Sequence, residues 1–197
     1  MFLFLDTETT GLPTRRGAHY TELDAWPRMV SACWAFYSPT GKELHYEYHI
    51  IRPDSFTIPH DVTLIHGITT ERALHEGIPL ATVLQKLATD IGERRPQLAV
   101  AHNMAFDQPV LLAEYLRIGL AQPMTSLRSF CTMVSTTELV RLPPFRYGKH
   151  KWPKLAELYY HLFGMDFPSG HHAGADVKAC AACFFELQRR GLAPRLS

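Results

Sequence analysis

The first half of the chain contains three apolar segments that read as strands. Residues 2–5 form a short unbroken apolar run, as expected for a central strand covered on both faces. A second apolar run covers residues 30–37, and a Pro- and Gly-containing turn follows it. Residues 43–51 then alternate, with Leu44, Tyr46 and Tyr48 on one face, which predicts a half-covered strand. Together these segments predict an antiparallel meander.

From about residue 58 the spacing of apolar residues becomes helical. Residues 80–91 repeat at three- and four-residue intervals and stop before Arg95 and Pro96. A strand at 97–103 leads into a helix over 105–118, and residues 127–133 suggest a fifth strand. Further helices are predicted at 155–162 and 174–190, each followed by a glycine. The predicted order is three strands and then strands that alternate with helices. This order predicts an α/β protein with a mixed sheet flanked by helices.

The length and composition narrow the class of protein. The 197 residues are expected to form one domain, 1–197, with a substantial core. A net charge of +1 excludes a global basic field, so any surface for nucleic acid must be local. The opening apolar run is too short for a signal peptide, and no segment approaches the length of a membrane span. Four cysteines suggest reduced thiols, so we expect a cytoplasmic protein without a membrane partner.

Acidic residues stand at the ends of three predicted elements. Asp6 and Glu8 follow the first strand, and because residues two apart project from one face, they converge while Thr7 faces away. Asp107 falls in the first turn of the helix after the fourth strand, and Asp176 falls at the start of the last helix. Surface acids and helix capping are the simpler alternatives for each one.

Four carboxylates that met at one point would repel one another unless cations bound there. Oxygen ligands of this kind suit Mg²⁺, or Mn²⁺ in its place, better than zinc. Two such ions about 3.5–4 Å apart clamp a phosphate, activate a water and stabilise the leaving oxygen. The sequence therefore predicts a two-ion site for phosphate chemistry if the three segments meet.

Three segments resemble known motifs. FLDTETTGL, AHNMAFDQPVL and HHAGADVKAC resemble, in this order, the three exonuclease motifs of the DEDD superfamily. The similarity is greatest to the DnaQ-like or DEDDh branch, which includes the proofreading epsilon subunit of bacterial DNA polymerase III. IPHDVTLIHGIT resembles the helix between the first two motifs of that branch, and the likeness runs from Phe2 to about Gln188. It implies a ribonuclease H-like fold with a five-stranded sheet, and metal-dependent 3′→5′ hydrolysis of nucleic acid to nucleoside monophosphates.

The resemblance also assigns roles at the predicted ion site. It makes the metal ligands Asp6, Glu8, Asp107 and Asp176. The superfamily divides on a histidine five positions before the last acid or a tyrosine four before it; here His171 and His172 occupy these positions. His171 fits the histidine branch and would be the general base, since an imidazole titrates near neutrality. His172 is the alternative for that role.

By the same resemblance, a pocket for the 3′-terminal nucleotide is lined by Thr9, Thr10, His66, Asn103 and Phe106. Unpaired bases are held by stacking and apolar contact, which tolerates any sequence. Core packing is the alternative for Phe106, and Asn103 is also expected to tie its loop to the backbone.

Other patterns in the sequence are weaker evidence for function. Residues 141–154 are basic with interleaved Phe145, Tyr147 and Trp152, which suits contact with a single strand, although a solvated loop explains them too. The same alternatives hold for Arg15 and Arg16. We interpret His45, Glu47 and His49 as the polar outer face of a strand rather than a metal site, and Cys180 and Cys183 as core thiols.

The leading hypothesis is an exonuclease that acts on single-stranded DNA or duplex 3′ ends, with a DNA polymerase as a partner that the resemblance allows. The alternatives are an RNA-directed exoribonuclease of the same family, distinguished by contacts to the 2′-hydroxyl, and a non-catalytic nucleic-acid-binding or polymerase-binding module. A metal phosphatase for small nucleotides has no further motif to support it. The sequence leaves the oligomeric state open.

Overall fold

A computed structural model of the chain describes residues 1–144, 149–167 and 173–196. The strands are β1 (Phe2–Thr9), β2 (Met29–Tyr37), β3 (Glu43–Ile50), β4 (Leu98–Ala101) and β5 (Ser129–Cys131). They form one sheet in the order β3-β2-β1-β4-β5. The first three pair antiparallel, whereas β4 joins β1 and β5 joins β4 in parallel. The predicted mixed five-stranded sheet is therefore confirmed.

The longer helices match those predicted from the sequence. They are α1 (His60–His66), α2 (Thr70–Glu76), α3 (Leu80–Arg94), α4 (Met104–Arg117), α5 (Thr132–Ser135), α6 (Thr137–Val140), α7 (Leu155–Phe163) and α8 (Ala173–Arg189), with a 3₁₀ turn η1 (Leu23–Ala25) in the loop after β1. The helices predicted from apolar spacing correspond to α3, α4, α7 and α8. Helices α5 and α6 are single turns, too short to produce a periodic pattern.

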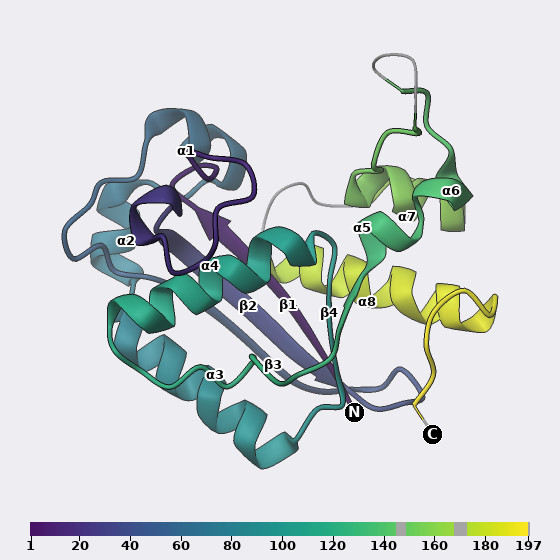
Figure 1. The fold of residues 1–197 in the computed structure, drawn as a ribbon, viewed down its shortest axis with the longest axis horizontal. Helices are drawn as coiled ribbons and strands as arrows, with labels where there is room; N and C mark the ends of the chain where they lie inside the picture. Colours follow the sequence, from purple (N-terminus) through teal and green to yellow (C-terminus); the bar gives the residue numbers. More distant parts are fainter. Residues whose placement is uncertain (145–148, 168–172, 197) are drawn as a thin grey trace.

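Helices cover both faces of the sheet, with α3 and α4 on one face and α8 on the other (Figure 1). Leu3 and Leu5 of β1 pack in the cluster that contains α3 and α4. Phe2 and Phe4 alternate with them and pack against Phe184 of α8, with ring centroids 5.0 and 5.5 Å apart. The opening strand is apolar on both faces because it is the central strand between these two layers.

The direction of α8 brings its first turn to the end of β1. Phe184 packs on the start of the strand, and eight residues of helix from Phe184 back to Asp176 span about 12 Å. Four residues of strand from Phe4 to Glu8 span about 13 Å. Because β4 runs parallel to β1, its carboxyl end and the start of α4 lie at this same edge of the sheet. Three segments distant in sequence thus end at one place.

The polar face of β3 corrects one prediction. The strand register sets Glu47 opposite Trp34, on the face of the sheet that α3 covers. His45, Glu47 and His49 have side chains only about one-fifth exposed. His45 contacts Asp90 and Glu47 contacts Lys86, both on α3. The prediction of an outer polar face was wrong because the alternation of polar residues does not reveal what covers them, and α3 presents a matching polar stripe.

Two smaller expectations concern membranes and thiols. Among residues 1–144, 149–167 and 173–196, no helix combines the length and apolar character needed to cross a membrane. All four cysteines are free; Cys33, Cys180 and Cys183 are buried, and Cys131 is half-buried. The interpretation of Cys180 and Cys183 as core thiols is confirmed.

Candidate active site

Three of the predicted carboxylates come together at the end of β1. Asp6 and Glu8 project toward the α8 side of the sheet, where they meet Asp176 in the first turn of α8. One carboxylate oxygen from each residue lies within 4.8 Å of the others. All three residues are only half-buried, so the cluster is open to solvent on one side.

The fourth acid reaches the cluster from the helix after β4. Asp107 lies in the first turn of α4 and is 3% exposed. Its Oδ1 accepts hydrogen bonds from the Thr7 backbone N–H at 3.0 Å and from the Thr7 hydroxyl at 2.9 Å. The pairing of β1 with β4 ends at Phe4 and Val100, so the Thr7 N–H lies beyond the last strand partner on that side. Asp107 takes the place of that partner and is fixed against β1.

Burial and the neighbouring charges change the titration of three of the acids, Asp6, Glu8 and Asp107. Burial raises the pKa of Asp6 well above its usual range, and the charges of Asp107, Asp176 and Glu8 add to this rise. Burial, followed by the charges of Asp176 and Asp107, raises the pKa of Glu8 to about 7. Burial also raises the pKa of Asp107 to about 7, although its hydrogen bonds from Thr7 oppose the rise. Each carboxylate therefore carries an electrostatic cost that a bound cation would remove.

The donor set suits divalent cations that prefer oxygen. Asp6, Glu8, Asp107 and Asp176 supply only carboxylate oxygens, the ligands that Mg²⁺ and Mn²⁺ favour. A bound divalent ion becomes the largest local charge in such a site and favours the ionised form of each acid. The residues present therefore fit the cation that the sequence predicts.

The two threonines after Glu8 shape the loop at the end of β1. The Thr9 hydroxyl donates to the Gly11 carbonyl at 2.7 Å. The Thr10 hydroxyl accepts the Arg28 N–H at 3.0 Å, and the Thr10 N–H donates to the Arg28 carbonyl at 2.9 Å. Both side chains thus hold the backbone in place, and their predicted contact with a terminal nucleotide stays a prediction.

His66 ends α1 close to the same loop. The imidazole is 6% exposed, and its Nδ1 accepts the Ile68 N–H at 3.1 Å. Burial lowers its pKa, an effect that the nearby Thr9 backbone partly offsets. Within the described part of the chain, the buried Nε2 has no hydrogen-bond partner of regular geometry. The effect of Thr9 on the pKa of His66 is that of a hydrogen bond to its backbone, so the imidazole interacts with the loop itself.

The other two predicted pocket residues belong to the start of α4. The Asn103 carbonyl accepts the N–H groups of Phe106 at 2.7 Å and Asp107 at 3.2 Å, so this residue ties the turn to the helix as expected. Phe106 is half-buried, packs against the core and lies 6.4 Å from the Trp26 ring. Part of the Phe106 side chain is therefore buried by core packing.

Several predicted residues lie outside the described residues or are engaged elsewhere. His171 and His172, and Phe145 and Tyr147 of the basic segment, lie outside the described residues. Within that segment, Lys151 pairs with Glu157 at 2.7 Å, and Trp152 is 53% exposed. Arg15 pairs with Glu22.

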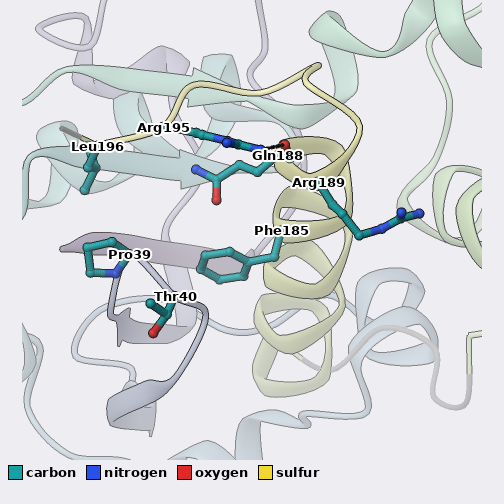
Figure 2. Close-up of a pocket in the computed structure, with 7 residues that line it drawn as sticks. All are labelled: Pro39, Thr40, Phe185, Gln188, Arg189, Arg195 and Leu196. Carbon is teal, nitrogen blue, oxygen red and sulfur yellow. Dashed lines mark hydrogen bonds between the residues drawn. The ribbon is translucent and has the colours of Figure 1, made fainter.

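A separate pocket lies at the opposite end of α8 from Asp176 (Figure 2). It has a volume of about 350 Å³, and Phe185 faces Pro39 and Thr40 across it. Its polar groups already have partners: Arg195 donates to the Gln188 carbonyl at 3.1 Å, and Arg189 pairs with Glu186. This pocket brings no acid, base or nucleophile together.

Thr7 is the residue of this site that the sequence interpretation did not assign. The motif pointed to the acids on either side of it, and its side chain was expected to face away from them, as it does. The sequence offered one hint of this role. Thr7 places a hydroxyl on the strand face opposite the acids, where the helix that carries Asp107 was expected to begin.

The sheet order and the helices on its two faces define a ribonuclease H-like fold, and solved structures share it. Exonuclease I of E. coli in a zinc-bound complex with single-stranded DNA matches 96% of this chain with a TM-score of 0.74 and 18% identity. The complex of E. coli exonuclease I with a dA16 oligonucleotide matches 96% of this chain with a TM-score of 0.74 and 20% identity. The nuclease domain of 3′hExo, a DEDDh family member bound to rAMP, matches 100% of this chain with a TM-score of 0.74 and 14% identity.

These matches differ in how much of the other protein they cover. The chain spans about 40% of the exonuclease I chain and 95% of the 3′hExo nuclease domain. No family model and no characterised protein sequence matches the chain. The likeness confirms the predicted fold, and a specific likeness to the epsilon subunit stays a prediction.

Proposed function

We propose that the chain is a metal-dependent 3′→5′ exonuclease that hydrolyses DNA, at single-stranded or unpaired ends, to nucleoside monophosphates. The observation that carries this proposal is the meeting of Asp6, Glu8 and Asp176 within 4.8 Å, with Asp107 close enough to raise the pKa of both Asp6 and Glu8. Carboxylates from three distant segments are gathered at a solvent-open edge of the sheet.

We infer the following roles for the acids. Asp6, Glu8, Asp107 and Asp176 would hold two Mg²⁺ ions, with Mn²⁺ able to replace them. When bound, these ions would supply charge neutralisation at the scissile phosphate and favour ionisation of the attacking water. Asp107 is held rigid by Thr7, whereas the half-buried acids face the opening through which a 3′ end would enter.

We assign the general base to His171. It stands five positions before Asp176, and its neutral imidazole would take a proton from the attacking water. His171→Ala should therefore slow hydrolysis while leaving metal binding intact. His172→Ala, the matched control one residue away, should retain most of the activity. If His172→Ala is the variant that loses activity, the base is His172.

The terminal nucleotide is proposed to lie beside Thr9, Thr10, His66, Asn103 and Phe106. His66 supports this placement only by its position, since its buried imidazole interacts with the Thr9 backbone of this loop. The likeness to exonuclease I structures that contain single-stranded DNA supports an unpaired strand as the substrate. The solved structures give no support for a DNA polymerase partner. That proposal depends on the sequence resemblance alone.

The second candidate is an exoribonuclease. The nuclease domain of 3′hExo, which this chain matches over nearly its whole length, is a DEDDh family member bound to rAMP. RNA and DNA differ at the 2′-hydroxyl, so oligonucleotides of the same sequence in both forms separate these candidates.

The test is a time course on single-stranded DNA labelled at either end. With Mg²⁺, the 5′-labelled strand should shorten as a descending ladder, and the 3′-labelled strand should release its label first as a mononucleotide. EDTA should abolish both reactions. Asp176→Asn should remove activity, whereas Asp166→Asn, a matched control at an exposed acid, should not.

Two results would contradict the proposal. One is removal of nucleotides only from the 5′ end. The other is Asp176→Asn protein that remains as active as the wild-type chain. Binding of single-stranded DNA without any hydrolysis would favour the non-catalytic module in place of the enzyme.

A further inference from the structure

A second group of potential ligands lies on the other face of the sheet. His45 and Glu47 of β3 and Asp90 of α3 each offer one ligand atom, and these atoms lie within 4.8 Å of one another. His45 and Glu47 are two residues apart and therefore project from the same face of the strand. Their side chains are each 20% exposed, and that of Asp90 is 8% exposed. The group is thus sheltered between the edge strand and its covering helix.

The distances within this group are those of a metal coordination sphere. His45 Nε2 lies 3.1 Å from Asp90 Oδ2 and 3.4 Å from Glu47 Oε1. Around a tetrahedral Zn²⁺ with bonds of about 2.0–2.1 Å, neighbouring ligand atoms are about 3.3–3.4 Å apart. The two distances from His45 Nε2 therefore match this spacing, and the two carboxylate oxygens lie within 4.8 Å of each other.

Neighbouring side chains orient the ligands from outside. The Trp34 indole N–H donates to Asp90 Oδ2 at 2.8 Å. His49 Nε2 lies 2.9 Å from Glu47 Oε2, and this buried nitrogen makes no hydrogen bond of regular geometry within the described residues. Outer groups of this kind fix the ligand carboxylates of metal sites.

Two basic side chains would balance the carboxylates when no metal is bound. Lys86 Nζ lies 3.0 Å from Glu47 Oε1, and Arg94 Nε lies 3.7 Å from Asp90 Oδ1. The Lys86 side chain is 41% exposed and can leave the carboxylate for water. Arg94 engages Oδ1 of Asp90, whereas Oδ2 contacts Trp34 and His45, so a bound cation would replace the His45 contact at Oδ2.

We propose that His45, Glu47 and Asp90 form a second divalent-cation site, one that accepts Zn²⁺ and links the edge strand β3 to α3. One imidazole with two carboxylates suits Zn²⁺ better than Mg²⁺, because the nitrogen ligand favours a softer ion. The site is separate from the acids at the end of β1, which face α8 on the opposite side of the sheet. Its role is to stabilise the β3–α3 contact, since a cation bound to the folded state raises the free energy of unfolding.

The test uses Co²⁺, a coloured substitute for Zn²⁺, on Asp176→Asn protein so that the first ion site is weakened. Visible absorption should report one bound Co²⁺ with a tetrahedral spectrum, and Zn²⁺ should displace it. Adding His45→Gln should weaken this binding at least about tenfold. The matched control, His161→Gln at an exposed histidine, should leave binding unchanged.

Further variants separate coordination from folding. Glu47→Gln should also weaken Co²⁺ binding, and Lys86→Met should strengthen it by removing the competing ammonium. In the otherwise wild-type chain, Zn²⁺ should raise the urea midpoint, and His45→Gln should abolish that rise while keeping exonuclease activity. Unchanged Co²⁺ binding in both His45→Gln and Glu47→Gln proteins overturns the proposal, as does the absence of any bound Co²⁺ in Asp176→Asn protein. Neither result depends on whether the chain cleaves DNA.

Discussion

The Thr7 side chain points away from Asp6 and Glu8, yet it belongs to their site through Asp107. Two hydrogen bonds from one residue to one carboxylate oxygen fix the position of Asp107 relative to β1. Only the hydroxyl bond depends on the identity of the side chain. Its contribution can therefore be measured without breaking the backbone contact.

Thr7→Val should remove this hydroxyl bond while keeping the shape of the side chain. A hydrogen bond to a charged group contributes about 1.5–3 kcal/mol, so we expect kcat/KM for a DNA oligonucleotide to fall roughly tenfold or more. The affinity for Mg²⁺ should fall in parallel, which calorimetric titration would measure. Thr7→Ser keeps the hydroxyl and should stay close to wild type. Equal activity of the valine and serine variants would show that Asp107 does not depend on this bond.

Glu8 links the site to the pH dependence of stability. Its pKa rises from 4.5 to about 7 on folding, so in metal-free protein the folded state holds a proton that the unfolded state has lost. The free energy of unfolding should therefore decrease as pH rises from about 4.5 to about 7. The decrease attributable to Glu8 is on the order of 1–3 kcal/mol.

Urea unfolding in EDTA at pH 5 and pH 8 checks this expectation. Glu8→Gln has no proton to lose, so it should match the wild type at pH 5 and exceed its stability at pH 8. Mg²⁺ should narrow the difference at pH 8 by stabilising the wild-type carboxylates. The same loss of stability in both proteins would mean that Glu8 is not buried among the other acids.

At the scale of elements, the loop after β1 is anchored by α4. Arg117 donates to three loop carbonyls: Leu23 at 2.6 Å, Trp26 at 2.7 Å and Pro27 at 3.2 Å. It also pairs at 3.0 Å with Glu114, whose Oε1 accepts the Met29 N–H at 2.8 Å. One helix thus carries Asp107 at its start and, at its end, holds the loop that follows β1.

Arg117→Met should loosen this loop and destabilise the fold. Glu114 keeps Arg28 as a partner at 3.1 Å, whereas the three loop carbonyls lose their donor, and lost hydrogen bonds to a charged group cost about 1.5–3 kcal/mol. Urea unfolding would measure the loss, and hydrogen exchange should increase over residues 11–28. Arg189→Met, at an exposed helix position, should leave the urea midpoint unchanged. Unaltered exchange in the loop of the Arg117 variant would refute the anchoring role.

The elements themselves could be predicted where periodicity was long enough to detect. The apolar run at the start of the chain predicted the central strand, and helical spacing predicted α3, α4, α7 and α8. The single turns α5 and α6 leave no periodic signal. The polar face of β3 was misinterpreted because its partner, the polar stripe of α3, lies 40 residues further along the chain. Alternation reports that two faces differ and does not report what covers each one.

At the scale of the whole molecule, the site could be predicted because its acids lie at element ends. The sheet topology brings Asp6, Glu8 and Asp176 together at one edge, and the charge of Asp107 acts on Asp6 and Glu8 there. That the four acids bind metal stays a prediction. The contribution of Thr7 could not be predicted, since it depends on where the β1–β4 pairing stops. The role of His171 rests on its position before Asp176 and stays a prediction.

The central claim is that these four acids form one divalent-cation site. Crystals grown with Mn²⁺ test it directly, because anomalous scattering locates the ion without assumptions about activity. We predict one or two Mn²⁺ peaks among the carboxylates of Asp6, Glu8, Asp107 and Asp176, at roughly 2.0–2.5 Å from their oxygens. A map with no Mn²⁺ among these carboxylates would contradict the account.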